Sequence, residues 1–239
     1  MTWPPPEALT EFYQQNYRYD ALFQSKAELY RGFARSLLGN LDGLGFQEKA
    51  ALLDIGCGGG FLVEEAERLG FSARGLEANA LAVDFCRRRG LNVIRGDLTS
   101  LTSADAIKFD IVVLSAVIEH VEDPLQLLMR AKGLLADDGV ILISQADFSG
   151  LLPRIAPWLW YGWQPAEHYW HFDRSAFQKL AERAGLYPRR IHVGSLYHPW
   201  SRSIRPKDLI GRNSAALVAR IGNYLGQGDS FDMVLSTRS

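Results

Sequence analysis

Several features that mark special classes of protein are scarce in this sequence. Its two cysteines, Cys57 and Cys86, follow no metal-binding or disulfide pattern, so we expect reduced thiols and a cytoplasmic location. No apolar run reaches the roughly 18 residues that a membrane-spanning helix requires, and Met1–Pro6 lacks the pattern of a signal peptide. The formal net charge is only −1, which removes the overall field that draws a protein to nucleic acid.

What the sequence does contain suits one globular α/β domain. Of its 239 residues, 47% are hydrophobic, which is enough to bury a large core. No internal repeat divides the chain. We expect a helical cap over residues 1–45, with a helix at Ala21–Leu38, followed by the main domain over residues 46–239.

The stretch Leu52–Gly60, with the letters LLDIGCGGG, is the most informative part of the chain. An apolar run at Ala50–Ile55 predicts a buried strand, and the amphipathic segment Phe61–Leu69 predicts a helix. The turn between them is rich in glycine, which lets the backbone bend sharply and a ligand approach without a Cβ atom in the way. The start of the helix offers N–H groups that have no partner within the helix. We expect a cofactor at this turn; the alternative is a turn that binds nothing.

The spacing of the glycines separates two classes of cofactor. A dinucleotide-binding turn has the pattern G-x-G-x-x-G, and here Phe61 stands where the third glycine belongs, which counts against NAD and FAD. The run D-I-G-C-G-G-G resembles instead the first motif of class I methyltransferases that depend on S-adenosylmethionine (SAM). By that resemblance, SAM binds at the turn and S-adenosylhomocysteine (SAH) leaves it. The resemblance implies cofactor contacts from Asp54, Gly56, Cys57 and Gly58.

Two further acids follow the next two predicted strands. The strand Ser72–Leu76 ends at Glu77, about 20 residues after the glycine turn, where nucleotide-binding sheets place the acid that accepts both ribose hydroxyls. The strand Leu91–Arg95 runs into Asp97, which by the same resemblance accepts the adenine amino group. The alternative for each acid is a solvated residue at the end of a strand. The neighbours of these acids complete the predicted contacts: Ala78 and Leu98.

The middle of the chain carries the resemblance further. The predicted elements are, in order, a strand at Phe109–Leu114, a helix at Leu125–Leu135 opened by Pro124, a turn at Ala136–Gly139 and a strand at Gly139–Ser144. The element I-E-H-V at Ile118–Val121 resembles ubiquinone-type O-methyltransferases. Over about Ala50–Ser144 the resemblance implies a Rossmann-like α/β fold, with a seven-stranded, mostly parallel sheet, helices on both faces and an antiparallel last strand. It also places three more residues beside the cofactor: Ser115, Ala116 and His120.

An aromatic segment over residues 145–172 follows this strand. It holds four of the six tryptophans and starts at the carboxyl edge of the sheet, where open α/β sheets bind their ligands. We interpret it as a lid over the methyl acceptor; the alternative is a compact loop that packs its own rings. Its end, His168–Phe172, resembles the P-x-H-x-x-x-F run of small methyltransferases that act on lipid, quinone or saccharide precursors.

The remaining chain completes the predicted sheet. A helix at Arg174–Ala184 and a strand at Tyr187–Val193 precede a second insertion over residues 195–228, and the last strand is Phe231–Ser236. We assign this second insertion, like residues 145–172, to the acceptor lid. The insertion contains an amphipathic helix at Lys207–Leu225 with arginines nearby. Such a helix could touch an anionic membrane, but we favour a role in covering the core. Its apolar face consists of Ile210, Leu217, Ile221 and Leu225.

Methyl transfer requires alignment and, for a hydroxyl acceptor, a group that takes the proton. Imidazole titrates near neutrality, so His120, His168 and His171 are the candidates, and we assign His120 and His168 as catalytic. The alternative for His120 is a histidine that only holds its loop. Glu119 could help to bind a divalent metal ion, but with no obvious second carboxylate we expect no metal.

The sequence therefore predicts a SAM-dependent methyltransferase that acts on a small-molecule, lipid-like or saccharide acceptor, with oxygen as the favoured target. The expected partner is an apolar or membrane-associated small molecule, and neither nucleic acid nor a transmembrane segment is expected. Two alternatives stay open: a non-catalytic SAM-binding module and a nicotinamide-dependent oxidoreductase. Nucleic-acid methylation is disfavoured because Ser115–Ile118 stands where an N-P-P-Y element would follow the fourth strand. Neither the acceptor nor the oligomeric state follows from the sequence.

Overall fold

The computed structural model of the protein describes residues 19–98, 108–160, 162–163, 168–194, 217–218 and 220–238. Residues 1–18 of the expected cap and much of the second insertion, including Ile210, lie outside these ranges. The elements are α2 (Tyr19–Leu38), η1 (Gly39–Leu41), β1 (Ala51–Ile55), α3 (Phe61–Arg68), β2 (Ser72–Glu77), α4 (Ala80–Arg88), β3 (Val93–Arg95), β4 (Phe109–Ser115), η2 (Ile118–His120), α5 (Pro124–Gly133), β5 (Leu135–Ala146), α6 (Leu151–Ile155), η3 (Pro157–Leu159), α7 (Arg174–Arg183), β6 (Tyr187–Gly194) and β7 (Ser230–Ser236).

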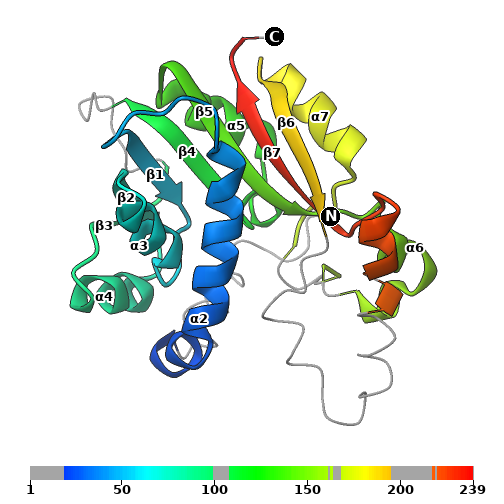
Figure 1. Cartoon of the computed structure of the whole chain (residues 1–239), viewed down its shortest axis with the longest axis horizontal. Coiled ribbons are helices and arrows are strands. Elements are labelled where there is room, and N and C mark those ends of the chain that lie inside the picture. The colour runs from blue at the N-terminus through cyan, green and yellow to red at the C-terminus, as the bar shows by residue number, and fades with distance from the viewer. Residues whose placement is uncertain are drawn as a thin grey trace.

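The strands form one seven-stranded sheet in the order β3-β2-β1-β4-β5-β7-β6 (Figure 1). The neighbours from β3 to β5 pair in parallel, whereas β7 pairs antiparallel with both β5 and β6. The predicted Rossmann-like sheet with an antiparallel last strand is confirmed. Because β1 and β4 run parallel, their carboxyl ends lie at one edge of the sheet. The strand order reverses between these two strands, and such sheets bind ligands at that point of the edge.

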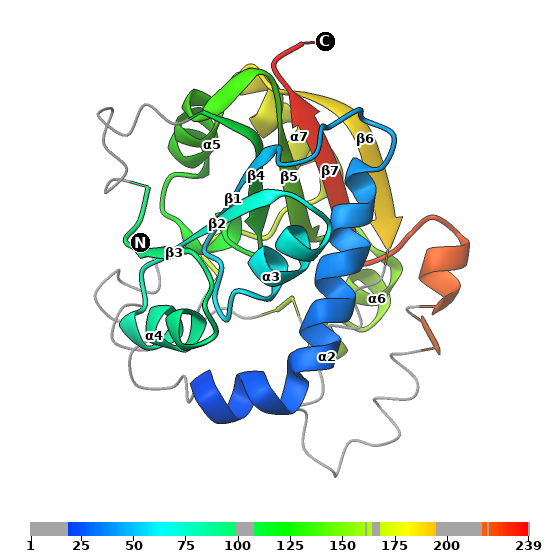
Figure 2. The same cartoon turned by 60° about the vertical axis from the view of Figure 1, so that its left-hand side comes forward.

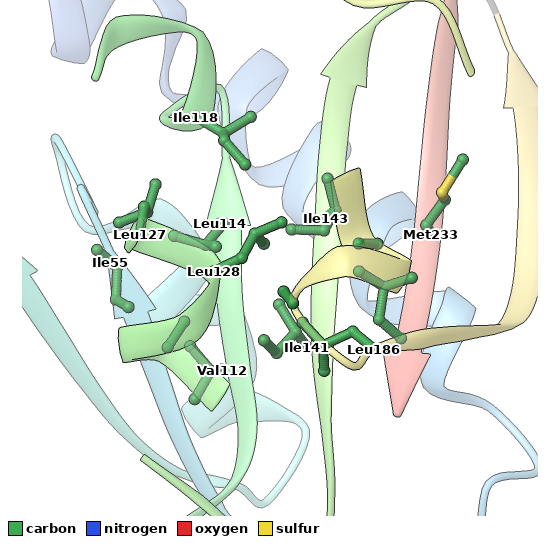
Figure 3. Close-up of a cluster of buried hydrophobic side chains, with 14 of the residues drawn as sticks. Ile55, Val112, Leu114, Ile118, Leu127, Leu128, Ile141, Ile143, Leu186 and Met233 are labelled. Carbon is green, nitrogen blue, oxygen red and sulfur yellow. The ribbon is translucent and has the colours of Figure 1, made fainter. Parts of the chain in front are cut away.

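Helices cover both faces of the sheet (Figures 1 and 2). On one face α2 and α3 contribute Ala34, Leu37 and Val63 to a core under the central strands. On the other face α5 and α7 pack Leu128 and Phe177 against the sheet. Figure 3 shows part of this second core, in which side chains from the sheet meet those of α5. Apolar strands buried on both faces explain why β1 and β4 are almost continuously hydrophobic.

The predicted turn at Ala136–Gly139 is wrong, because β5 already begins at Leu135. Leu135 pairs with Phe109 and Val140 with Ile111, so the residues between them form an irregularity within the strand. At Gly139 an added Cβ atom would lie 2.9 Å from the carbonyl oxygen of Phe109. The close approach of two backbones, rather than a chain reversal, explains this glycine.

The core-covering role that we favoured for the second insertion is wrong for its described residues. Residues 217–218 and 220–224 are helical, as predicted. However, Leu217, Ile221 and Leu225 are 59%, 44% and 56% exposed. Among the described residues, no helix is both long and apolar enough to cross a bilayer.

Candidate cofactor and acceptor site

The glycine turn follows β1 at the carboxyl edge of the sheet. Gly56, Gly58 and Gly60 have φ angles of 70°, 51° and 72°, a region that glycine enters without the strain of a Cβ atom. A Cβ atom on Gly56 would also lie 2.7 Å from Cγ2 of Val117. The turn therefore requires glycine both for its backbone conformation and for its packing against the loop after β4.

Glu77, at the end of β2, is bound directly to this turn. Its Oε2 accepts a hydrogen bond from the Gly58 N–H at 2.8 Å, and its Oε1 accepts one from the Asn79 N–H at 2.8 Å. Each carboxylate oxygen keeps a further lone pair for a ligand. The prediction that Glu77 faces the turn agrees with this geometry, and the carboxylate is held in place before any ligand arrives.

Asp54 lies on β1 behind the turn and is 3% exposed. Burial, and secondarily the negative charge of Glu77, raise the pKa of Asp54 to about 8. A shift of this kind favours the protonated carboxyl group at neutral pH, which can donate a hydrogen bond as well as accept one.

The side chain of Cys57 packs against β2 and α4. It hydrogen-bonds with Cys86 of α4, and this bond together with burial raises the pKa of the Cys57 thiol well above its ordinary value. A Cβ atom on Gly75 of β2 would lie 2.5 Å from its Sγ. The predicted cofactor contact of Cys57 is thus left to its backbone, because its thiol is part of the packing between β2 and α4.

The other predicted cofactor residues lie along the same edge. Asp97 is exposed and Leu98 is half-buried after β3, while Ala78 is exposed after β2. Ser115 ends β4, and Ala116 has a φ of 52°, a strained value for a residue with a Cβ atom. The Ala116 N–H donates to the carbonyl of Ser144 at 3.0 Å, which fixes this bend beside β5.

His120 and His168 come together although they are far apart in the sequence. Their ring centroids are 4.7 Å apart and their planes are at 83°. Two hydrogen bonds to backbone carbonyls produce this approach: the Tyr169 backbone N–H donates to the Glu119 carbonyl at 2.8 Å, and the Trp170 indole N–H donates to the Val121 carbonyl at 2.9 Å. The aromatic segment is therefore attached to η2 at the point that brings both predicted catalytic histidines to one place.

Glu119 completes a cluster with the two histidines. It is 2% exposed, its Oε1 is 4.0 Å from His120 Nε2, and its Oε2 has no hydrogen-bond partner in the described part of the chain. Burial raises the pKa of Glu119 to about 7. One ligand atom from each of Glu119, His120 and His168 lies within 4.8 Å of the others, so these three could bind a metal ion. Sequence reasoning missed this grouping because His168 has no sequence proximity to Glu119.

A cluster of aromatic rings stands next to this group. The His171 ring lies 4.7 Å from Trp163, 6.2 Å from Phe148 and 6.3 Å from Trp160, measured between centroids. Burial lowers the pKa of His171, which favours its neutral form. These rings pack against one another, which both the predicted lid and the alternative of a compact loop would give, so the lid stays a prediction. Phe148 is a member of the cluster that sequence reasoning did not name.

Comparison with protein families shows to which family this chain belongs. A sequence model described as a methyltransferase domain matches residues 26–190, which include the glycine turn, the acids after β2 and β3 and the histidine cluster. The chain belongs to the SAM-dependent methyltransferases. Membership in this family removes the alternative of a nicotinamide-dependent oxidoreductase, in agreement with Phe61 in place of the third glycine.

Curated relatives of this methyltransferase share part of its length. It is 30% identical over 186 residues to a ubiquinone biosynthesis O-methyltransferase of Cereibacter sphaeroides, a match that covers 72% of this chain and 75% of that protein. The protein of the same name from Actinobacillus pleuropneumoniae is 33% identical over 103 residues. That match covers 39% of this chain and 44% of the relative, so the chain spans less than half of that relative's length.

Solved structures of methyltransferases share the fold. The magnesium protoporphyrin IX methyltransferase of Synechocystis, solved with bound SAH, superposes with a TM-score of 0.66 at 14% identity, covering 97% of this chain and 99% of that one. SAM is the cofactor of this methyltransferase. The residues at the glycine turn fit such a molecule, since the Cβ position of Gly58 has only the Phe23 ring near it, at 3.9 Å, and Glu77 keeps acceptor capacity.

Proposed function

We propose that this methyltransferase transfers the methyl group of SAM to a hydroxyl oxygen of a small-molecule, lipid-like or saccharide acceptor. The observation that carries the proposal is the contact between His120 and His168 of the aromatic segment, at the edge of the sheet that bears the glycine turn. The names of the relatives, ubiquinone biosynthesis O-methyltransferases, support oxygen as the target.

The cofactor half of the proposed site uses backbone and carboxylate groups. Gly58 leaves room beside the turn, Glu77 accepts the ribose hydroxyls, and Asp97 accepts the adenine amino group. When bound, SAM supplies an electrophilic methyl group that reacts by in-line displacement. Ser115 and Ala116 border the same space from the end of β4. The protein itself contributes alignment and the exclusion of water.

The acceptor half of the proposed site provides the proton acceptor. His168 Nδ1 lies 3.1 Å from the Gly162 carbonyl, which can only accept, so Nδ1 carries the hydrogen and Nε2 carries the lone pair. His168 Nε2 or His120 then takes the proton of the acceptor hydroxyl as the oxygen attacks. Residues 145–172 act as the acceptor lid, and the rings of Phe148, Trp163 and His171 favour an apolar or planar acceptor.

The test is a turnover assay with SAM and a panel of hydroxylated acceptors, phenols, prenylated phenols and sugars among them, with SAH formation as the readout. We expect SAH to form only with the hydroxylated members and not with their methyl ethers. Turnover of amines in preference to hydroxyls would overturn oxygen as the target. SAH binding without turnover of any acceptor class would favour the non-catalytic SAM-binding module instead.

A further inference from the structure

The N-terminal helix α2 contacts the glycine turn directly. Phe23 is 4% exposed, and its ring carbons lie 3.0 Å from the position that a Cβ atom on Gly59 would take. Its ring also meets Phe61, the first residue of α3, edge to face at 5.9 Å. Figure 2 shows the N-terminal part of α2 running below α4. The cap and the turn thus share one packed surface.

A chain of charged groups connects the same elements. Arg89, immediately after α4, donates to the Gly59 carbonyl at 2.6 Å and to Glu64 Oε2 at 2.6 Å. Glu64, on α3, accepts two further bonds from Arg31 of α2, at 2.9 and 3.2 Å. The connection therefore runs from α2 through α3 to the carbonyl of a residue inside the glycine turn.

These ion pairs are partly shielded from water. The side chains of Arg31, Glu64 and Arg89 are only 23%, 25% and 21% exposed. The Arg89 guanidinium also stands over Phe61, 4.5 Å from its centroid. Because Arg89 is shielded from water and lies over the Phe61 ring, its interaction with the Gly59 carbonyl is stronger than that of an exposed surface pair. A hollow of about 320 Å³ beside Arg31 and Arg89 still admits water, so the expected effects are moderate.

A neighbouring pair of charges offers a natural comparison. Arg35 lies one turn after Arg31 on α2 and binds Glu65 on α3 at 3.2 Å. The other side chain on Glu65 is Arg68 of the same helix, at 3.2 Å. Both Arg31 and Arg35 therefore tie α2 to α3, but only the partner of Arg31 also holds Arg89.

We propose that Arg89 is a positioning residue for the SAM-binding turn, and that Arg31 and Glu64 couple its hold on Gly59 to the docking of α2. The proposal rests on the glycine turn as the place where the cofactor binds. Because the bonds are shared, cofactor binding and the docking of α2 stabilise each other. Arg89 acts through the backbone of the turn and needs no contact with the cofactor.

The test is calorimetric titration of the full chain with SAH, with melting temperatures recorded for every variant. We expect Arg89→Ala to weaken SAH binding about 10-fold and Arg31→Ala about 3-fold. Arg35→Ala, the matched control, should bind SAH within twofold of the wild type even if its melting temperature falls. Since Arg31 and Arg89 share Glu64, the double variant should lose less affinity than the two single losses combined.

Two further measurements separate positioning from mere stability. Arg89→Lys keeps the charge but cannot reach both Gly59 and Glu64, so it should bind SAH more weakly than the wild type. This variant replaces Arg89→Ala in the test if Arg89→Ala does not fold. SAH should slow hydrogen exchange in α2 in the wild type and in Arg35→Ala, but much less in Arg31→Ala. Equal SAH affinities for Arg31→Ala and Arg35→Ala, or wild-type affinity in the Arg89 variants, would overturn the proposal. Failure of the wild type to bind SAH would instead overturn the cofactor site.

Discussion

The two halves of the site are assembled in different ways. In the cofactor half, Glu77 binds Gly58 and the loop beside it through backbone hydrogen bonds within one β-α-β unit. In the acceptor half, His120 and His168 meet only because backbone bonds attach the aromatic segment to η2. A site made from one continuous unit tolerates change elsewhere, whereas a site made from two distant segments depends on how they dock. The predictions below test this difference.

The largest effect is expected in the acceptor half. His168→Ala should lower turnover by at least about 100-fold, because general base catalysis contributes on the order of 10²–10⁴. SAH binding should stay within twofold, since the histidine lies outside the cofactor half. Turnover with the acceptor found by screening and calorimetry with SAH check both parts. A comparable loss of SAH affinity would show that the halves are not separate.

The next effect concerns the conformation of the glycine turn. Gly56→Ala should destabilise the protein by about 2–4 kcal/mol, because it adds strain at positive φ and a clash with Val117. Gly43→Ala is the matched control, since Gly43 has a φ of 75° but nothing within 4 Å of its Cβ position. Urea unfolding should show that Gly43→Ala lowers the free energy of unfolding by only about 1–2 kcal/mol. Equal losses would mean that packing against Val117 contributes nothing.

A dependence on pH should come from Asp54. Its pKa is raised from 3.8 to about 8 in the folded state, so the folded protein binds this proton more tightly than the unfolded chain does. The resulting stability is complete below about pH 4 and is lost as the pH rises through 8. As the pH rises from 5 to 8, the free energy of unfolding of Asp54→Asn should therefore increase by about 2–4 kcal/mol relative to that of the wild type. Parallel pH profiles from urea unfolding would refute the shift.

A smaller effect is expected at Glu77. Glu77→Ala should weaken SAH binding by about 1–3 kcal/mol, the cost of unpaired polar groups on the ribose and on the Gly58 N–H. Glu182→Ala, which removes an exposed carboxylate on α7, is the control and should leave SAH affinity unchanged. Calorimetry measures both. Wild-type affinity in Glu77→Ala would remove this residue from the cofactor site.

The smallest effect should come from the exposed side of the acceptor half. Ile221→Ser should change the free energy of unfolding by no more than about 0.5 kcal/mol, because Ile221 is 44% exposed. Leu142→Ser is the opposing control, since Leu142 is fully buried in β5. A loss above 1.5 kcal/mol in Ile221→Ser would mean that this helix covers part of the core after all.

The same contrast explains what could be predicted from the sequence. The strand–turn–helix around Gly56 and the acid at Glu77 were predictable because spacing within one β-α-β unit fixes their geometry. The partnership of Glu119 with His168 was not, since it depends on the docking of a distant segment. The turn expected at Ala136–Gly139 was wrong because a glycine required by close backbones resembles one required by a reversal. The exposure of Ile221 was missed because amphipathic spacing does not say whether the apolar face finds a partner.

The position of β7 has a consequence for how the chain is made. β7 follows β6 in the chain but lies between β5 and β6 in the sheet. Before residues 230–236 leave the ribosome, β3, β2, β1, β4 and β5 can already pair, whereas β6 still lacks β7, its neighbour among the described strands. The nascent chain must therefore carry an unmatched strand until residues 230–236 emerge and join the two parts in a single late step.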